Sequence, residues 1–312
     1  MSSLDLSALG AERAAEAAAL VARSFAPLDL RRSTIRRWPC AVLRCREVSP
    51  PAVSVRDLVS SVGGWSSVAA PPANGHNAVP VCPAHARGLA PGERMAPPPP
   101  PGCRDWMQTF VGVAFRPLHP DPDLVDARDL AHHLAAVNRY TGATAWPYSV
   151  GEHACRVARE VWERATAAGA SDLDRALLAL AALLHDGSEA YLNDMVRPLK
   201  HAPELAAYRA AERPVQAAVY AAFGLPATAD LHPWIKDADN ALLTAEAPAL
   251  LGYPPGPWGL ERYAAARPIT RPLRWWEAEE AFSSLLFALV DTVEAYGAEA
   301  DGRPLTAPPS GA

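Results

Sequence analysis

Residues 178–194, LALAALLHDGSEAYLND, constrain this chain more than any other stretch. The first half is rich in Leu and Ala and long enough for a buried helix, and it ends in His185 and Asp186. Neighbouring helix residues point about 100° apart, so these two side chains converge on one ion only near a helix end. Glu189 returns to their face at spacings of three and four residues. The stretch therefore predicts a metal site with an acid or base beside it.

Helical periodicity dominates the chain from residue 102 onward. Apolar residues recur there at spacings of three and four, and no segment alternates at period two for long. Ser149 and Glu152 form the capping pair of the helix that carries His153. Further helices are expected at about 126–140, 203–223, 233–251 and 272–296, the last with Trp275, Phe282, Leu286 and Val290 inward, and a loop is expected at 196–201. We predict an all-α fold.

Composition changes near residue 102. The 32 prolines are too many for a uniformly helical protein, and they cluster in the first third, which ends in the run APPPPPG, and around 248–257. Such a segment buries too little apolar surface to offset its ordering entropy. We expect residues 1–101 to form a largely disordered Pro- and Ala-rich segment with a short helix at about 3–24, residues 102–297 to form the folded domain, and residues 298–312 to form a disordered tail.

Charge and hydropathy exclude several classes of protein. The net charge of −5 provides no field that attracts nucleic acid or an anionic membrane, and six arginines between residues 31 and 46 more often mark a solvated tail than a phosphate contact. No stretch approaches the ~20 apolar residues of a membrane span. The first residues lack an export signal, and five irregularly spaced cysteines make no disulfide framework. We expect a cytoplasmic protein that binds neither membrane nor nucleic acid. Whether it forms a homo-oligomer is left open by the sequence.

Four side chains are candidate metal ligands: His153, His185, Asp186 and Asp239. Each emerges from an apolar helical face, where an unpaired polar group would be costly. Each one alone has an ordinary structural explanation, whereas the set is far more specific. Asp237 competes with Asp239, because the two differ by about 200° around a helix and only one can face the ion.

Three segments resemble a known family: YSVGEHACRV, LLHDGSEAYLNDMVRPLK and IKDADNALLTAEA. Together with the lead-in MQTFVGVAFRPLHPDPDLVDARDLAHHLAAVNRYTG, they resemble the HD-domain metal-dependent phosphohydrolases, and within these the branch of the 5′-deoxynucleotidases and the phage deoxyadenosine triphosphate triphosphohydrolases. The resemblance covers residues 104–296. Gly187 stands where Ala is more usual, which would loosen the helix end that aims Glu189, and Ala154 with Cys155 replaces a Ser-containing pair.

The resemblance implies an HD-domain helical bundle in which His153, His185, Asp186 and Asp239 hold one divalent cation. Two imidazoles and two carboxylates suit Mn, Co, Fe, Ni or Zn. Such an ion activates water and polarises a phosphoryl oxygen. Glu189 is then the expected catalytic acid or base, and its alternative role is to orient His185.

The same resemblance implies residues that bind the substrate. Arg139 matches the position that clamps phosphate, and Arg197 and Lys200 add positive charge after the HD pair; solvated loop charge is the alternative for each. Asp194 matches a position near the sugar, where it would sense the absent 2′-hydroxyl, or it caps the next loop. Trp146 is a candidate for stacking on the base, although aromatic residues at such spacing more often belong to the core.

We therefore expect a phosphohydrolase acting on a small-molecule nucleotide, in the first place a deoxynucleoside 5′-monophosphate. The alternative enzyme removes the whole triphosphate from a deoxynucleoside triphosphate such as dATP, because the two kinds of enzyme share ligands and differ in pocket walls. An alternative from another class is a non-catalytic regulatory module that binds metal and nucleotide. A further hypothesis makes the N-terminal segment an interaction tail on an ordinary hydrolase domain.

Overall fold

The computed structural model describes residues 66–69, 78–81, 99, 101–252, 255–260, 262–263, 266–296 and 305. The predicted helix at 3–24, most of the N-terminal segment and nearly all of the predicted tail lie outside these residues. The chain divides into two compact units, with a boundary between residues 130 and 131. The limits predicted for the folded domain, 102 and 297, stay predictions.

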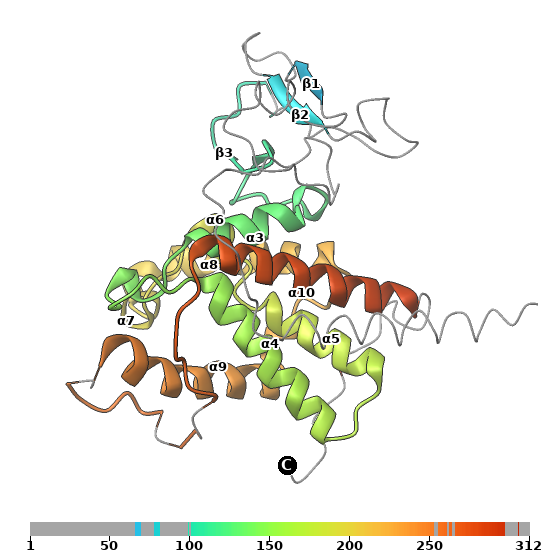
Figure 1. Ribbon diagram of the computed structural model, residues 1–312. Coiled ribbons are helices and arrows are strands. Elements are labelled where there is room, and N and C mark those ends of the chain that lie inside the picture. Colours follow the sequence, from blue (N-terminus) through green and yellow to red (C-terminus); the bar gives the residue numbers. More distant parts are fainter. Residues whose placement is uncertain are drawn as a thin grey trace, which may run out of the picture. The chain divides into compact units, whose positions relative to one another are not determined.

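The unit that precedes residue 131 contains two short antiparallel ribbons (Figure 1). Strand β1 (Ser66–Ala69) pairs with β2 (Ala78–Val81), and β3 (Met107–Gln108) pairs with β4 (Ala114–Phe115). The 3-10 helix η2 (Pro122–Leu124) follows, and the carboxylate of Asp121 caps it by accepting from the amide of Asp123. Val111 donates its amide to the buried Asp129 at 2.8 Å, which ties the β3–β4 turn to the start of the next helix.

Helices are the main secondary structure of the remaining described residues, and this confirms the all-α prediction. Helix α3 (Ala127–Ala136) crosses the boundary between the units. The α-helices after it are α4 (Val150–Ala167), α5 (Asp172–Leu183), α6 (Glu189–Leu192), α7 (Arg197–Lys200), α8 (Ala206–Ala222), α9 (Pro233–Glu246) and α10 (Trp275–Ala295). Helix α9 continues as a π-helix, Ala247–Leu251. None of the described helices combines the length and the apolar composition required to cross a membrane.

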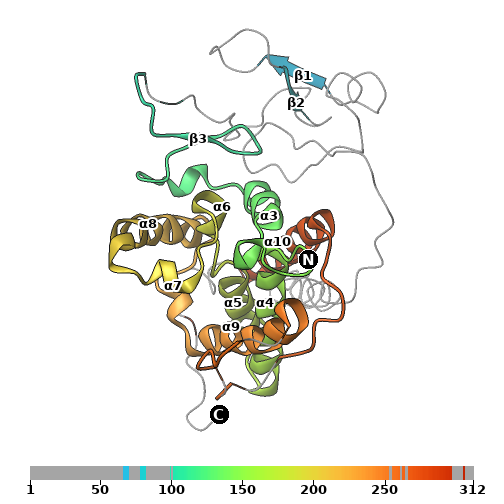
Figure 2. The ribbon, with the colours of Figure 1, turned by 90° about the vertical axis from the view of Figure 1, so that its left-hand side faces the viewer.

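Helix α5 lies at the centre of the second unit, where it packs against both α4 and α10 (Figures 1 and 2). Its apolar residues from Leu177 to Leu183 are all buried, as the Leu- and Ala-rich sequence predicts. Helix α9 packs mainly against α4 and also contacts α5. The arrangement brings the C-terminal end of α5 and the N-terminal part of α4 to the same region of the core.

Truncating Leu180 to Ala tests the central place of α5. The side chain is 1% exposed, and a cavity in such a position lowers the free energy of unfolding by about 2–5 kcal/mol. Leu231→Ala is the matched control, because that leucine is 71% exposed and its loss should change the free energy of unfolding by less than about 0.5 kcal/mol. Urea denaturation measures both changes, and equal effects would contradict a core built on α5.

Helix α3 is shorter than predicted, since it ends at Ala136 and not at about Tyr140. The chain after it pairs with the residues before α4: the amide of Arg139 donates to Tyr148 O, and the amide of Val150 donates to Val137 O. These contacts draw residues 137–139 out of the helix. The 3-10 turn η3 (Arg139–Gly142) follows, with Tyr140 at φ 58° and Thr141 at φ 52°. A left-handed non-glycine residue costs about 1–2 kcal/mol, so surrounding contacts must hold this turn.

Two further predictions about local structure are wrong. Residues 196–201 were expected to be a loop, but Arg197–Lys200 form the short helix α7. Pro198 fits in its first turn, because an amide hydrogen at that position would have no partner within the helix. Trp275 was expected to point inward, but it is the first residue of α10 and is 49% exposed. Phe282 and Leu286 are buried as predicted, and Val290 is half-buried.

Candidate metal centre

His153 lies in the first turns of α4, and its side chain is fully buried. The amide of Glu152 donates to the hydroxyl of Ser149 at 3.1 Å, so the helix begins where the capping pair predicted. The glycine at 151 allows a close approach, because a Cβ there would lie 3.1 Å from the backbone nitrogen of Ala135. The helix start is therefore fixed against α3, and His153 is fixed with it.

His185 and Asp186 lie just beyond the end of α5, in the turn that leads to α6. The side chain of Gln216 on α8 braces this turn at both ends: its oxygen accepts from the amide of Ser188 at 2.9 Å, and its nitrogen donates to Leu184 O at 2.7 Å. Because both bonds are buried, the turn is held firmly.

Gly187, in the same turn, contacts α8 closely. A Cβ at this position would lie 2.7 Å from Cγ1 of Val219 and 3.0 Å from Leu184 O. Alanine could be placed here only if Val219 moved. Glycine at position 187 therefore fits the close packing of this turn against α8.

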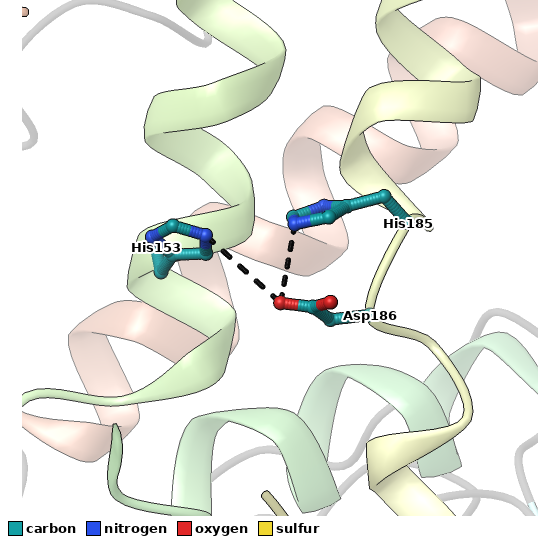
Figure 3. A group of neighbouring side chains, drawn as sticks. All are labelled: His153, His185 and Asp186. Atoms are coloured by element: carbon teal, nitrogen blue, oxygen red, sulfur yellow. Dashed lines mark ion pairs between the residues drawn. The ribbon is translucent and has the colours of Figure 1, made fainter. Parts of the chain in front are cut away.

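The three ligand atoms of His153, His185 and Asp186 lie within 4.8 Å of one another (Figure 3). Oδ2 of Asp186 is 3.1 Å from Nε2 of His185 and 3.9 Å from Nε2 of His153. Both Nε2 atoms are buried, and neither makes a hydrogen bond to another described residue. Two imidazole nitrogens and a carboxylate that converge in this way fit a divalent transition metal.

Asp239 approaches the centre from α9. It is buried, and its Oδ1 lies 3.4 Å from Nε2 of His153. Its Oδ2 accepts from Arg197 at 2.9 Å and from Lys236 at 3.1 Å, so one oxygen faces the centre while the other is neutralised. Asp237 is exposed, as expected if only one of the two aspartates faces the ion.

Glu189 begins α6 and is 4% exposed. Its Oε1 lies 3.9 Å from the ammonium of Lys200, and its Oε2 has no hydrogen-bond partner among the described residues. Burial, together with the charges of Asp186 and Asp194, raises the pKa of this carboxyl well above its usual range. Glu189 is thus a buried carboxyl group with one unpartnered oxygen, beside the carboxylates of Asp186 and Asp194.

The candidate substrate residues differ in how close they lie to the centre. Arg139 is buried, and its Nη1 lies 3.5 Å from Oδ2 of Asp186. Arg197 contacts the centre through Asp239, whereas the ammonium of Lys200 forms its close ion pair with Glu212 on α8 and lies 3.9 Å from Glu189. Asp194 is half-buried, and burial raises the pKa of its carboxyl. Trp146 is 70% exposed.

Two buried residues at the centre are absent from the sequence-based predictions. Gln216 holds the turn after α5, and Glu246 accepts from Nδ1 of His153 at 2.6 Å. Glu246 lies seven residues after Asp239, a spacing of two turns that puts both carboxylates on one face of α9. That spacing was a readable signal, whereas the sequence around Gln216 shows none.

Comparison with known proteins gives the protein's relatives. Over 154 residues, which are 48% of this chain and 75% of the relative, it is 37% identical to the uncharacterized protein RCAP_rcc00048 of Rhodobacter capsulatus. Over 141 residues, 45% of this chain and 70% of the relative, it is 28% identical to the uncharacterized protein YfdR of Escherichia coli. No family model matches the sequence.

Fold and site thus define an all-α protein with a candidate His/Asp metal centre. The chain belongs to the same family as the Rhodobacter capsulatus protein.

Proposed function

We propose that the protein is an HD-domain metal-dependent phosphohydrolase that acts on a deoxynucleotide, in the first place a 5′-monophosphate. The observation that carries the proposal is the pair of buried imidazole nitrogens, on His153 and His185, that converge with Asp186 and form no hydrogen bond within the described structure. A divalent transition ion bound there would supply Lewis-acid activation of water and of the phosphoryl group. The resemblance of the three sequence segments supports the same assignment.

The chain's own residues supply the proton transfer. Glu189 is buried beside the ligand cluster, and its Oε2 is left for a partner outside the described protein. In the proposed reaction this carboxyl donates a proton to the oxygen that leaves with the nucleoside. Lys200, 3.9 Å from the other oxygen, stabilises the carboxylate that remains.

Arginine and lysine side chains around the centre suit a phosphate substrate. Arg139 lies against Asp186 from the buried side, and Arg197, whose side chain is 46% exposed, lies against Asp239. A guanidinium donates two parallel hydrogen bonds to phosphate oxygens, so these two groups hold and neutralise the phosphoryl group. A triphosphate carries more negative charge than a monophosphate, and Arg139, Arg197 and Lys200 place three cations beside Asp186, Asp239 and Glu189. Removal of an intact triphosphate from a deoxynucleoside triphosphate is therefore the second candidate function.

Product analysis tests the proposal. The full-length protein is stripped of metal, resupplied with Co²⁺ or Mn²⁺, and incubated with deoxynucleoside mono- and triphosphates, and the products are separated by chromatography. We expect nucleoside and inorganic phosphate from the monophosphates. Nucleoside with intact triphosphate would favour the second candidate. Absence of turnover with metal bound would overturn both and leave the regulatory module. The Asp186→Asn protein, purified in parallel, measures contaminating phosphatase.

A further inference from the structure

Glu246, the last residue of α9, has 0% exposure and lies between the metal centre and the η3 turn. A buried carboxylate is costly unless hydrogen bonds and opposite charge compensate it. Donors surround both of its oxygens, and they come from elements that are far apart in the sequence.

One oxygen of Glu246 faces the metal centre. Oε1 accepts from Nδ1 of His153 at 2.6 Å and from the hydroxyl of Tyr148 at 2.9 Å. Because a carboxylate only accepts, Nδ1 of His153 must carry the proton. Nε2 then presents its lone pair toward Asp186 and Asp239, as a metal ligand requires.

The other oxygen faces the phosphate-binding side. Oε2 accepts a short hydrogen bond from the hydroxyl of Tyr140, and it lies 3.5 Å from Nε of Arg139. Tyr140 is one of the left-handed residues of η3, so this bond helps to hold the turn in its unfavourable conformation. Arg139 is thereby held with Nη1 toward Asp186.

We propose that Glu246 is a positioning residue that fixes the metal ligand His153 through one carboxylate oxygen and the phosphate-binding Arg139 through the other. The inference rests on the metal centre proposed above and adds a physical link between metal binding and phosphate binding. It predicts that loss of the Glu246 charge weakens both, whereas loss of the Tyr140 hydroxyl weakens phosphate binding alone.

Calorimetric titration of Co²⁺ into the metal-stripped, full-length protein tests the first link. We expect Glu246→Gln to lower the Co²⁺ affinity about 10- to 100-fold, the usual effect of losing the partner of a metal-bound histidine. Glu277→Gln is the matched control, because Glu277 is 4% exposed and caps α10 away from the centre; its Co²⁺ affinity should equal that of the wild type. A folded Glu246→Gln protein with wild-type affinity would overturn the inference.

Inorganic phosphate, titrated into the Co²⁺-loaded protein, tests the second link. Tyr140→Phe should weaken phosphate binding about 2- to 10-fold, the effect of one hydrogen bond, and leave the Co²⁺ affinity unchanged. Unchanged phosphate binding would overturn this link. If Glu246→Gln does not fold, Tyr148→Phe removes one donor to the His153 side and should weaken Co²⁺ about 2- to 10-fold, with no change again overturning the link.

These binding measurements separate the inference from the proposed function. A wild-type protein that binds Co²⁺ but turns over no nucleotide would overturn the hydrolase proposal, while the effect of Glu246→Gln on Co²⁺ would still decide the inference. A wild-type protein that binds no Co²⁺, Mn²⁺ or Zn²⁺ would overturn the metal centre and the inference together.

Discussion

Glu189→Gln should lower kcat for the preferred deoxynucleotide by about 10²- to 10⁴-fold and leave the metal content unchanged. Glutamine keeps the volume of this buried side chain but has no proton to transfer at neutral pH. The measurement is steady-state turnover of the Co²⁺- or Mn²⁺-loaded protein, with metal content determined by elemental analysis of the same sample. Glu189→Ala should lose at least as much activity.

The matched control for this prediction is Glu277→Gln. Glu277 is as buried as Glu189, but its carboxylate accepts from the amide of Arg274 at the start of α10, away from the ligand cluster. Its turnover should stay close to that of the wild type. If Glu189→Gln loses metal along with activity, the residue orients His185 and takes no part in proton transfer; unchanged turnover would remove it from the mechanism altogether.

His185→Ala should abolish turnover and also the stabilisation of the fold by metal. A ligand that binds only the native state adds about 2.7 kcal/mol to the free energy of unfolding at 100 times its dissociation constant. We therefore expect Co²⁺ to raise the melting temperature of the wild type but not that of His185→Ala. Thermal unfolding with and without Co²⁺ measures this difference.

His201→Ala provides the comparison, because this histidine is exposed at the end of α7. Its melting temperature should respond to Co²⁺ as the wild type does. An equal response in His185→Ala would show that the ion binds elsewhere and would remove the metal centre from the turn after α5.

Local signals made the centre of the site predictable from the sequence. His185, Asp186 and Glu189 lie within five residues at the end of an apolar helix, and Ser149 with Glu152 marks a helix start. Such signals need only the periodicity of a helix and the chemistry of its ends. The all-α architecture was predictable for the same reason.

Long-range contacts decide the features that the sequence did not reveal. Glu246 reaches His153 across 93 residues, and Gln216 reaches the amide of Ser188 across 28. No glycine in the sequence marks the left-handed backbone at Tyr140. The hydroxyl of Tyr140 donates to Glu246 on α9, and this long-range contact holds the conformation. Helix α7 has only one turn, too few residues for apolar periodicity to appear.

The close contact between Gly187 and Val219 makes the sizes of two distant positions depend on each other. In a relative with alanine at the position of Gly187, the added methyl group needs space that only a smaller residue on α8 can provide. Across the family we therefore expect these positions to covary, so that alanine after the His-Asp pair accompanies a residue smaller than valine on α8. The effect of a substitution at the position of Val219 would then depend on which residue stands at the position of Gly187.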